Sequence, residues 1–236
     1  MPIDIYQQAL NFEIKNSLFE CLSEHQLHEL LSVSVVKKYH KKQLILNRDN
    51  CLNSVYFLLD GILQVGYMSA GGRFHALSYF SDKNVINVIP CLEQQVLDYD
   101  YYAFNSVCLL VIPADIFLAM LQKNQALMQK VLALIALRMR QLLIEIKFLQ
   151  TSNLQQKLCH LLLKLSNQYG DVQGQDIEIK LALSQSDLAD LLSVSRQTVN
   201  KEMRGLIKSD VIDWYRKNIV IKNKSYLEFQ IKYLRD

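Results

Sequence analysis

The first part of the chain carries short apolar runs separated by turn residues. Residues 55–68 predict two strands around Asp60 and Gly61, a dipeptide that suits the positive backbone dihedrals of a tight hairpin. Further strands are predicted at regular intervals, at 73–80, 84–89, 101–104 and 107–113. Regularly spaced short strands are typical of a sandwich or barrel, so we expect a β-domain here. Helical segments are expected before it, around Ile5–Leu10 and Glu24–Ser32.

From Pro113 the apolar spacing becomes helical, with a short helix over residues 114–124 and a long one from Gln125 to about Thr151. Within the long helix, apolar residues recur at alternating steps of four and three: Met128, Leu132, Ile135, Met139, Leu142, Ile146 and Leu149. This heptad seam is typical of a helix that pairs with a second helix. Other apolar residues lie off the seam, so the helix needs cover on two sides. We expect one side to pack on the β-domain and the seam on the same helix of a second copy; burial inside a monomer is the alternative.

Residues 184–208 predict two short amphipathic helices joined by a tight turn. Ser184 can cap the first helix, and Asp187 three residues later can complete a capping box. Ser195 begins the second helix. The residues expected to face inward are Val199, Met203, Leu206 and Ile207, and those expected to face outward are Arg196, Gln197, Asn200, Lys201 and Arg204.

The outward face of that second helix carries the chemistry of base recognition. Arginine pairs with guanine edges, asparagine and glutamine with adenine edges, and lysine with guanine or phosphate. The pattern therefore predicts a DNA-binding helix-turn-helix. An ordinary helix hairpin with a solvated charged face is the alternative.

Strand-like segments flank the two helices, at residues 177–183 and again at 211–222 around a turn over 215–218. A helix-turn-helix with a small sheet beside it is a winged helix, and here the wing tip is basic. Between Ser195 and Lys224, eight basic residues stand against three acidic ones, whereas the formal net charge of the whole chain is only +3. Such a local excess favours binding to phosphates.

Composition excludes several classes of protein. The 236 residues are 50% hydrophobic and 21% charged, as in a globular chain rather than a disordered one. The opening residues have no signal-peptide pattern, and the most apolar stretch, 131–137, is too short to cross a bilayer. We therefore expect a cytoplasmic protein with no membrane partner.

The sequence carries no pattern of a catalytic or metal site. The five cysteines are scattered without a C-x-x-C pair, so we expect reduced packing residues rather than a disulfide or metal framework. Glycine-rich phosphate loops, paired-carboxylate motifs and nucleophile elbows are not found in the sequence. The protein is not expected to be an enzyme.

The order of these elements, with the motifs SRQTVNKEMRGL and VYFLLDGILQV, resembles the CRP/FNR family of bacterial transcription regulators over nearly the entire chain. The family's recognition helix begins with a similar S-R-x-T-V segment. The resemblance implies an α+β fold: an N-terminal double-stranded, jelly-roll-like β-roll of the cyclic-nucleotide-binding type, a long dimerisation helix and a C-terminal winged helix-turn-helix. We place these parts at residues 1–123, 124–152 and 153–236.

The resemblance also implies roles for residues of the helix-turn-helix. Arg196, Gln197 and Lys201 match base-reading positions, and Asn200 and Arg204 lie beside them. Phosphate contacts are implied or expected for Ser184, Gln185, Ser195, Thr198 and, on the wing, Arg216 and Lys217. Gln197 replaces the acidic residue of most members, which accepts from cytosine, whereas glutamine also pairs with adenine. Ser193 stands where helix-turn-helix proteins often have glycine, so we expect modest strain in the turn.

The sensor half departs from members that bind cyclic AMP. Their phosphate cassette contains Gly-Glu and, about ten residues later, Arg-Ser or Arg-Thr. Here Ile86 and Asn87 match the first pair, and Leu97 and Asp98 match the second. Leu97 cannot pair with a phosphate and Asp98 would repel one. We therefore expect a degenerate effector pocket at Asn87, Leu97 and Asp98, without cyclic AMP control by the usual chemistry.

No cofactor is expected. The oxygen-sensing branch has clustered N-terminal cysteines for an iron–sulfur centre, whereas Cys21 stands alone. Haem is the alternative: the potential axial ligands are His25, His28, His40, His75 and His160, but no spacing singles one out. The resemblance implies a homodimer that binds a pseudo-palindromic site on double-stranded DNA and works with RNA polymerase. The alternative function is a sensor or protein-interaction module without direct DNA recognition.

Overall fold

A computed structural model describes residues 18–48, 53–72, 74–81, 83–96 and 99–232. The expected helix around Ile5–Leu10 lies outside these residues. The chain forms two compact units, Met1–Arg138 and Met139–Asp236, and the long helix α5 (Gln125–Thr151) begins in the first and ends in the second. Among the described residues, no helix combines the length and apolarity that spanning a membrane requires.

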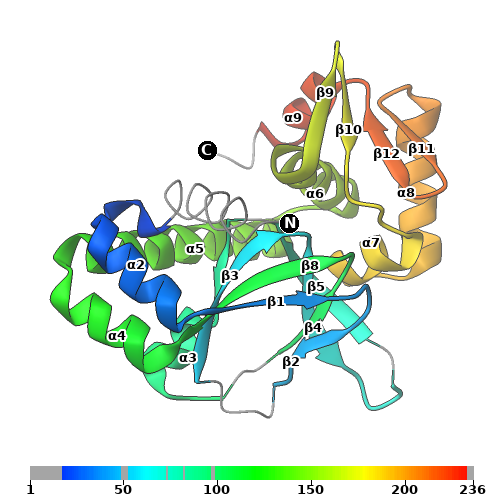
Figure 1. The fold of residues 1–236 in the computed structure, drawn as a ribbon. Coiled ribbons are helices and arrows are strands. Elements are labelled where there is room, and N and C mark those ends of the chain that lie inside the picture. The colour runs from blue at the N-terminus through cyan, green and yellow to red at the C-terminus, as the bar shows by residue number, and fades with distance from the viewer. Residues whose placement is uncertain (1–17, 49–52, 73, 82, 97–98, 233–236) are drawn as a thin grey trace. The chain divides into compact units, whose positions relative to one another are not determined.

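The first unit is a roll of two four-stranded antiparallel sheets with helices around it (Figure 1). One sheet has the strand order β1-β8-β3-β6 and the other β2-β7-β4-β5. The strands are β1 (Val35–Tyr39), β2 (Leu44–Leu46), β3 (Ser54–Asp60), β4 (Leu63–Met68), β5 (Phe74–Phe80), β6 (Val85–Ile86), β7 (Asp100–Ala103) and β8 (Val107–Pro113). The helices are η1 (Leu18–Cys21), α2 (Glu24–Val33), α3 (Val88–Glu93) and α4 (Ala114–Lys123).

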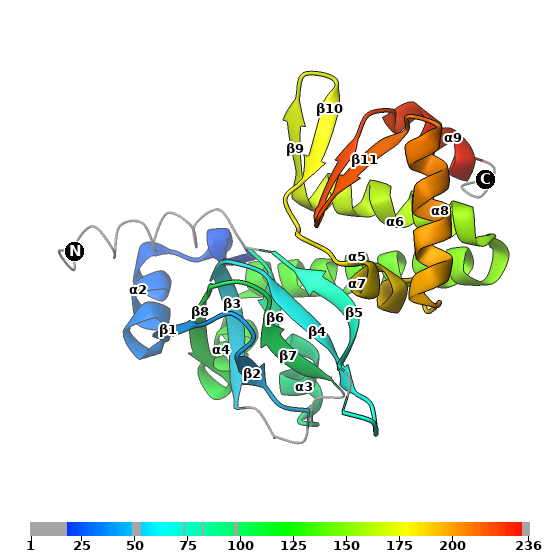
Figure 2. The same cartoon turned by 90° about the vertical axis from the view of Figure 1, so that its right-hand side faces the viewer.

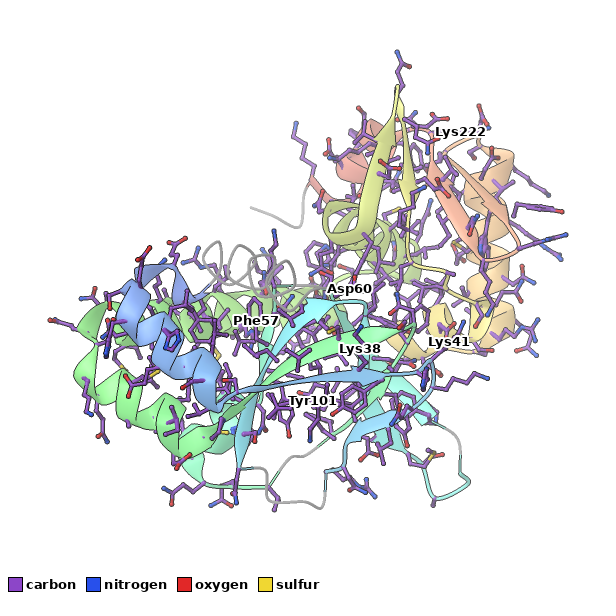
Figure 3. The ribbon with its side chains drawn as sticks, in the orientation of Figure 1. Lys38, Lys41, Phe57, Asp60, Tyr101 and Lys222 are labelled. Atoms are coloured by element: carbon purple, nitrogen blue, oxygen red, sulfur yellow. The ribbon has the colours of Figure 1, made fainter. Side chains whose placement is uncertain are left out.

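Strand β3 contributes side chains to both hydrophobic cores of this unit. Its residues alternate between them: Val55 and Phe57 belong to a cluster with α2, α4 and the start of α5, while Tyr56 and Leu58 belong to a cluster between the sheets. Because both faces are covered, the strand is apolar almost throughout. The side chains of Phe57 and Tyr101 can be located within the roll in Figure 3.

Two of the predicted strand arrangements are wrong. β3 and β4 lie in different sheets, so Asp60 and Gly61 pass the chain from one sheet to the other and do not close a hairpin. Gly61 does have a positive φ, of 95°, and a Cβ there would lie 2.2 Å from the Ser106 carbonyl oxygen. The strand predicted over 84–89 ends at Ile86, since Asn87 turns the chain at φ 67° and Val88 begins α3.

Lysines mark the exposed edge of the first sheet. β1 is an edge strand that pairs only with β8 among the described strands, and Lys37, Lys38, Lys41 and Lys42 along it and in the following turn are exposed. Lys38 and Lys41 are labelled in Figure 3. Charged side chains on an edge strand oppose pairing with the edge of another sheet.

The second unit is built around α6 (Leu154–Tyr169), which packs against α9 (Lys224–Ile231). A four-stranded antiparallel sheet has the order β11-β12-β10-β9, from β9 (Gly170–Gln173), β10 (Asp176–Ile179), β11 (Ile212–Tyr215) and β12 (Asn218–Ile221). Helices α7 (Gln185–Leu191) and α8 (Arg196–Lys208) complete the unit (Figure 2). β10 ends at Ile179 and is therefore shorter than the predicted strand over 177–183.

Candidate nucleic-acid interface

The start of α7 has the predicted capping box. The Ser184 hydroxyl accepts from the Asp187 backbone N–H at 3.2 Å, and the Asp187 carboxylate accepts from the Ser184 N–H at 2.7 Å. In the same way Ser195 caps α8, where its hydroxyl accepts from the Thr198 N–H at 3.1 Å. These bonds satisfy N–H groups that a helix start leaves without partners. They fix where each helix begins.

The turn between the helices is tight and strained, as expected. Ser193 has φ 54°, in the left-handed region that glycine adopts more easily. Its N–H donates to the Asp190 carbonyl at 3.0 Å, and the Val194 N–H donates to the Ala189 carbonyl at 3.0 Å. The chain thereby passes from Leu191 at the end of α7 to Arg196 at the start of α8 within four residues, and the two helices pack together.

The buried and exposed faces of α8 carry the residues that the sequence pattern predicts, with one exception. Val199, Met203 and Leu206 are buried, whereas Ile207 is 36% exposed and is not part of the inward face. Ile207 is the last residue but one of α8. The four charged or amide side chains Arg196, Gln197, Lys201 and Arg204 are exposed, and Asn200 is half-buried. The structure therefore brings the candidate base-reading residues together along one face.

A contact between the two helices was not predicted. The Arg196 Nε donates to the Gln185 Oε1 at 2.8 Å. Gln185, expected only as a phosphate contact, thus also orients the guanidinium of the first residue of α8. The two residues are 11 positions apart in sequence, and no spacing rule pairs them.

The wing is the hairpin of β11 and β12. Tyr215 and Asn218 form its last backbone pair, which leaves Arg216 and Lys217 at the tip, both exposed. Arg216 has φ 57°, and its guanidinium carbon lies 5.3 Å from the centroid of the Tyr215 ring. Tyr215 itself is 72% exposed.

Two of the basic residues counted in this region are already paired. Lys222, which is labelled in Figure 3, binds Asp210 and Asp213, each at 2.9 Å. These two hydrogen bonds raise the pKa of the lysine. Lys224 lies 3.9 Å from Glu228. Among the described residues no carboxylate pairs with the remaining cations, which are Arg196, Lys201, Arg204, Lys208, Arg216 and Lys217. Within residues 195–224, the positive charge that lacks a carboxylate partner thus lies on α8 and the wing tip.

Of the three residues predicted to form the effector pocket, the structure describes only Asn87. Asn87 is 4% exposed and its side-chain amide donates to the Ser54 carbonyl at 2.6 Å, a bond that anchors the chain before α3. Leu97 and Asp98 lie outside the described residues. Arg138 of α5, which the sequence did not single out, donates to the Val85 carbonyl at 2.6 Å and lies 5.8 Å from the Phe80 ring centroid.

Two of the described cysteines, Cys91 and Cys159, are buried packing residues. Cys21, Cys91, Cys108 and Cys159 form no disulfide bond, while Cys51 lies outside the described residues. Burial raises the pKa of Cys159 to about 11, which keeps it a thiol and unreactive. His160 stacks on Phe148 with ring centroids 3.8 Å apart. Within the described part of the chain, His, Cys, Asp and Glu form no group able to hold a metal ion.

A β-roll, a long helix and a winged helix-turn-helix with a basic recognition face define a DNA-binding regulator. Two family models match the chain: the cyclic nucleotide-binding domain over residues 36–124 and the Crp-like helix-turn-helix domain over residues 156–229. The chain belongs to the CRP/FNR family of transcription regulators. Members of this family bind DNA, typically as dimers, and they are not enzymes.

Individual relatives are similar over most of their length. An anaerobic regulatory protein of Bacillus subtilis is 23% identical, with 89% of this chain and 90% of that protein covered. A global nitrogen regulator of Nostoc is 25% identical, with 79% and 85% covered. The solved structure of a CooA mutant from Carboxydothermus hydrogenoformans has a TM-score of 0.71 at 18% identity, with 86% and 90% covered. FixK2 from Bradyrhizobium japonicum also scores 0.71, at 16% identity, with 84% and 97% covered.

Proposed function

We propose that the protein is a homodimeric transcription regulator that recognises a pseudo-palindromic DNA site with two copies of α8. A two-fold dimer presents two identical surfaces, so each half-site receives one recognition helix. The observation that carries this proposal is the unpaired, exposed cationic face of α8 beside an equally unpaired wing tip. The protein is expected to act in the cytoplasm together with RNA polymerase.

The seam of α5 supports the dimer. Leu132, Met139, Leu142, Ile146 and Leu149 are between 40% and 58% exposed. Met128 and Ile135 are half-buried, because they pack against the core of their own β-domain. A contiguous apolar row on a helix is typical of an interaction surface. A second copy of the same helix matches its heptad spacing and completes the burial.

Within each half-site we assign two kinds of contact. Base edges would be bound by Arg196, Gln197, Asn200, Lys201 and Arg204, and phosphates by Ser184, Gln185, Ser195, Thr198, Arg216 and Lys217. The N-terminus of α8 favours a phosphate, because its backbone N–H groups and helix dipole point outward there. Gln185 can bind Arg196 and a phosphate at the same time, since its oxygen accepts from Arg196 and its NH₂ can donate to a phosphate.

Selection of bound fragments from random double-stranded DNA tests this function directly. The purified protein should enrich a two-fold symmetric site whose half-sites lie about 10 base pairs apart, one turn of the duplex. Footprinting should show protection of both halves at a stoichiometry of two chains per site. Enrichment of no sequence, or of a single asymmetric half-site, would contradict the proposal.

We also propose that cyclic nucleotides do not control the protein through the usual phosphate cassette. The support is chemical: the residue matched to the ribose-binding glutamate is Asn87, whose amide already donates to the Ser54 carbonyl. Calorimetric titration with cyclic AMP and cyclic GMP should give no heat of binding at micromolar concentrations. Saturable binding in that range would overturn this part of the proposal.

A further inference from the structure

The tip of the wing carries an aromatic side chain that the fold of the unit does not use. Along β11, Ile212 is buried and Trp214 half-buried, so Asp213 and Tyr215 lie on the opposite, solvated face. Asp213 is paired with Lys222. Tyr215, 72% exposed, stacks only with the guanidinium of Arg216 among the described residues.

At the tip, Arg216 occupies a backbone conformation that disfavours residues with a Cβ. Its φ of 57° falls in a region that disfavours side chains with a Cβ, and two-residue hairpin turns usually place glycine or asparagine there. Strained positions that persist in a fold are frequent at functional sites. Here the strain projects a long cationic side chain from the end of the hairpin.

The charge at the tip is also uncompensated. The acidic residues nearest in sequence, Asp210 and Asp213, are both bound by Lys222, and no carboxylate among the described residues pairs with Arg216 or Lys217. A planar cation backed by an aromatic ring therefore stands at the tip of the β11–β12 hairpin. For loose attraction to phosphates, lysines on a flexible turn would suffice, and neither the ring nor the strained backbone would be needed.

We infer that Arg216, backed by Tyr215, enters the DNA minor groove beside each half-site and favours flanks with a narrow, A·T-rich groove. Narrow minor grooves have enhanced negative potential and attract inserted arginines. An aromatic ring held against the guanidinium keeps it extended and offers an apolar surface to the groove wall. This inference rests on the proposed function, adds a groove contact for Arg216, and leaves Lys217 as a phosphate contact.

The test holds the selected half-sites constant and varies only the flanks. Three duplexes carry A-tract, G·C or inosine·cytosine flanks; the last has the major groove of G·C but lacks the guanine amino group in the minor groove. The wild-type protein should bind the A-tract duplex about tenfold more tightly than the G·C duplex, on the scale of one base-pair discrimination. The inosine·cytosine duplex should recover most of that difference.

Two variants separate groove insertion from charge. Arg216→Lys keeps the positive charge but should reduce the A-tract preference to within about twofold, because lysine lacks the planar fork. Lys217→Gln, the matched neighbour, should weaken all three duplexes alike and leave the preference intact. Tyr215→Ser should reduce the preference without changing the slope of affinity against salt. Circular dichroism verifies that each variant is folded.

The outcomes distinguish this inference from the function on which it rests. Wild-type binding to the half-sites with equal affinity for all three flanks would overturn the minor-groove contact and leave the regulator intact. A flank preference that survives Arg216→Lys would also overturn it. Failure to bind the selected half-sites with any flank would instead contradict the proposed function.

Discussion

The hydrogen bond from Arg196 to Gln185 joins α8 to α7 through one side chain of each helix. An arginine that reads a guanine must present its fork at a fixed angle, and an exposed side chain loses conformational entropy when it adopts one geometry. The Gln185 oxygen, 2.8 Å from Nε, holds that geometry before DNA arrives. Gln185 is therefore a positioning residue for the base contact that we assign to Arg196.

Removal of this side chain should reduce discrimination at one base pair only, while loss of its phosphate contact lowers affinity for all sequences alike. Gln185→Ala should reduce discrimination at the position contacted by Arg196 by part of the roughly 1–3 kcal/mol that a bidentate contact is worth, whereas Arg196→Ala removes all of it. Quantitative binding to duplexes with single substitutions at each position measures the effect. Discrimination at the positions of Lys201 and Arg204 should stay unchanged.

Gln185→Glu provides the matched control. It keeps an acceptor for Arg196 but replaces the NH₂ donor with a negative charge that repels phosphate. Affinity should therefore fall for all sequences while discrimination at the Arg196 position is retained. Equal losses of discrimination in the Ala and Glu variants would show that Gln185 has no positioning role.

The turn residue Ser193 leads to a prediction about stability. At φ 54° a side chain with a Cβ is strained by about 1–2 kcal/mol, while glycine loses about 0.5–1 kcal/mol more conformational entropy on folding. Ser193→Gly should thus raise the free energy of unfolding of the DNA-binding unit by about 0.5 kcal/mol. Ser193→Val should lower it, because β-branched residues disfavour this region. Urea unfolding monitored by circular dichroism measures both, and stabilisation by valine would contradict the strain.

Residue-level features of the site were predictable where they depend on local sequence. The caps at Ser184 and Ser195 and the strain at Ser193 follow from neighbours within four positions. The pairing of Lys222 with Asp210 and Asp213 does not, because it depends on how β12 returns beside the end of α8 and β11. The bond from Arg196 to Gln185 depends on tertiary packing in the same way.

Among the helices, α5 and α6 are joined by a charged cluster. Glu145 of α5 lies 2.8 Å from the Lys164 Nζ and 3.4 Å from the His160 Nε2, both on α6. Beside this cluster is a cavity of about 510 Å³, lined in part by Phe148 and Leu163. Burial raises the pKa of Glu145, but hydrogen bonds from His160 and Lys164 outweigh it and lower the pKa to about 2.

The depressed pKa predicts loss of this stabilisation in acid. The carboxylate pKa is lower in the folded state than its ordinary 4.5, so the stabilisation is fully present above about pH 4.5 and is lost as the pH falls toward 2. Glu145→Gln should therefore be less stable than the wild type at pH 7, and the difference should shrink between pH 4.5 and 2. Urea unfolding of both proteins across this range measures the difference. A difference that is constant with pH would contradict the role of the charge.

The elements that were predicted well are those whose apolar residues recur over a long stretch or in a distinctive pattern. The 27 residues of α5 and the paired helices α7 and α8 lie where expected. The change of sheet at Asp60 and Gly61 was missed, because a turn dipeptide specifies backbone dihedrals but not which strand the chain joins next. β1 and β2 were missed because lysines interrupt the apolar alternation of β1 and β2 has only three residues. The first two residues of α3, Val88 and Ile89, were assigned to a strand because short apolar runs fit both periods.

For the whole molecule, the exposed seam predicts that two copies associate along α5. Leu142 is 55% exposed, and in a parallel pair its counterpart would lie opposite it. Leu142→Glu would place two like charges in contact and should shift the protein to a monomer, as measured by sedimentation velocity. Leu137→Glu is the control, since Leu137 is 47% exposed but lies off the seam. A wild-type protein that sediments as a monomer would contradict the proposed dimer.

The salt dependence of DNA binding connects the wing to the number of copies on the site. Each phosphate neutralised by a cation contributes about −0.9 to the slope of log affinity against log salt concentration. Lys217→Gln removes one such contact from each chain, so a dimer on a two-fold site should lose about 1.8 of slope and a single bound chain about 0.9. Gel shifts on the selected site over a range of salt concentrations measure the change. Lys222→Gln is the control: because Lys222 is held by Asp210 and Asp213, its loss should leave the slope nearly unchanged. A slope change of about 1.8 for Lys217→Gln would require the phosphate contact and the two-fold symmetry together, whereas no change would remove Lys217 from the interface.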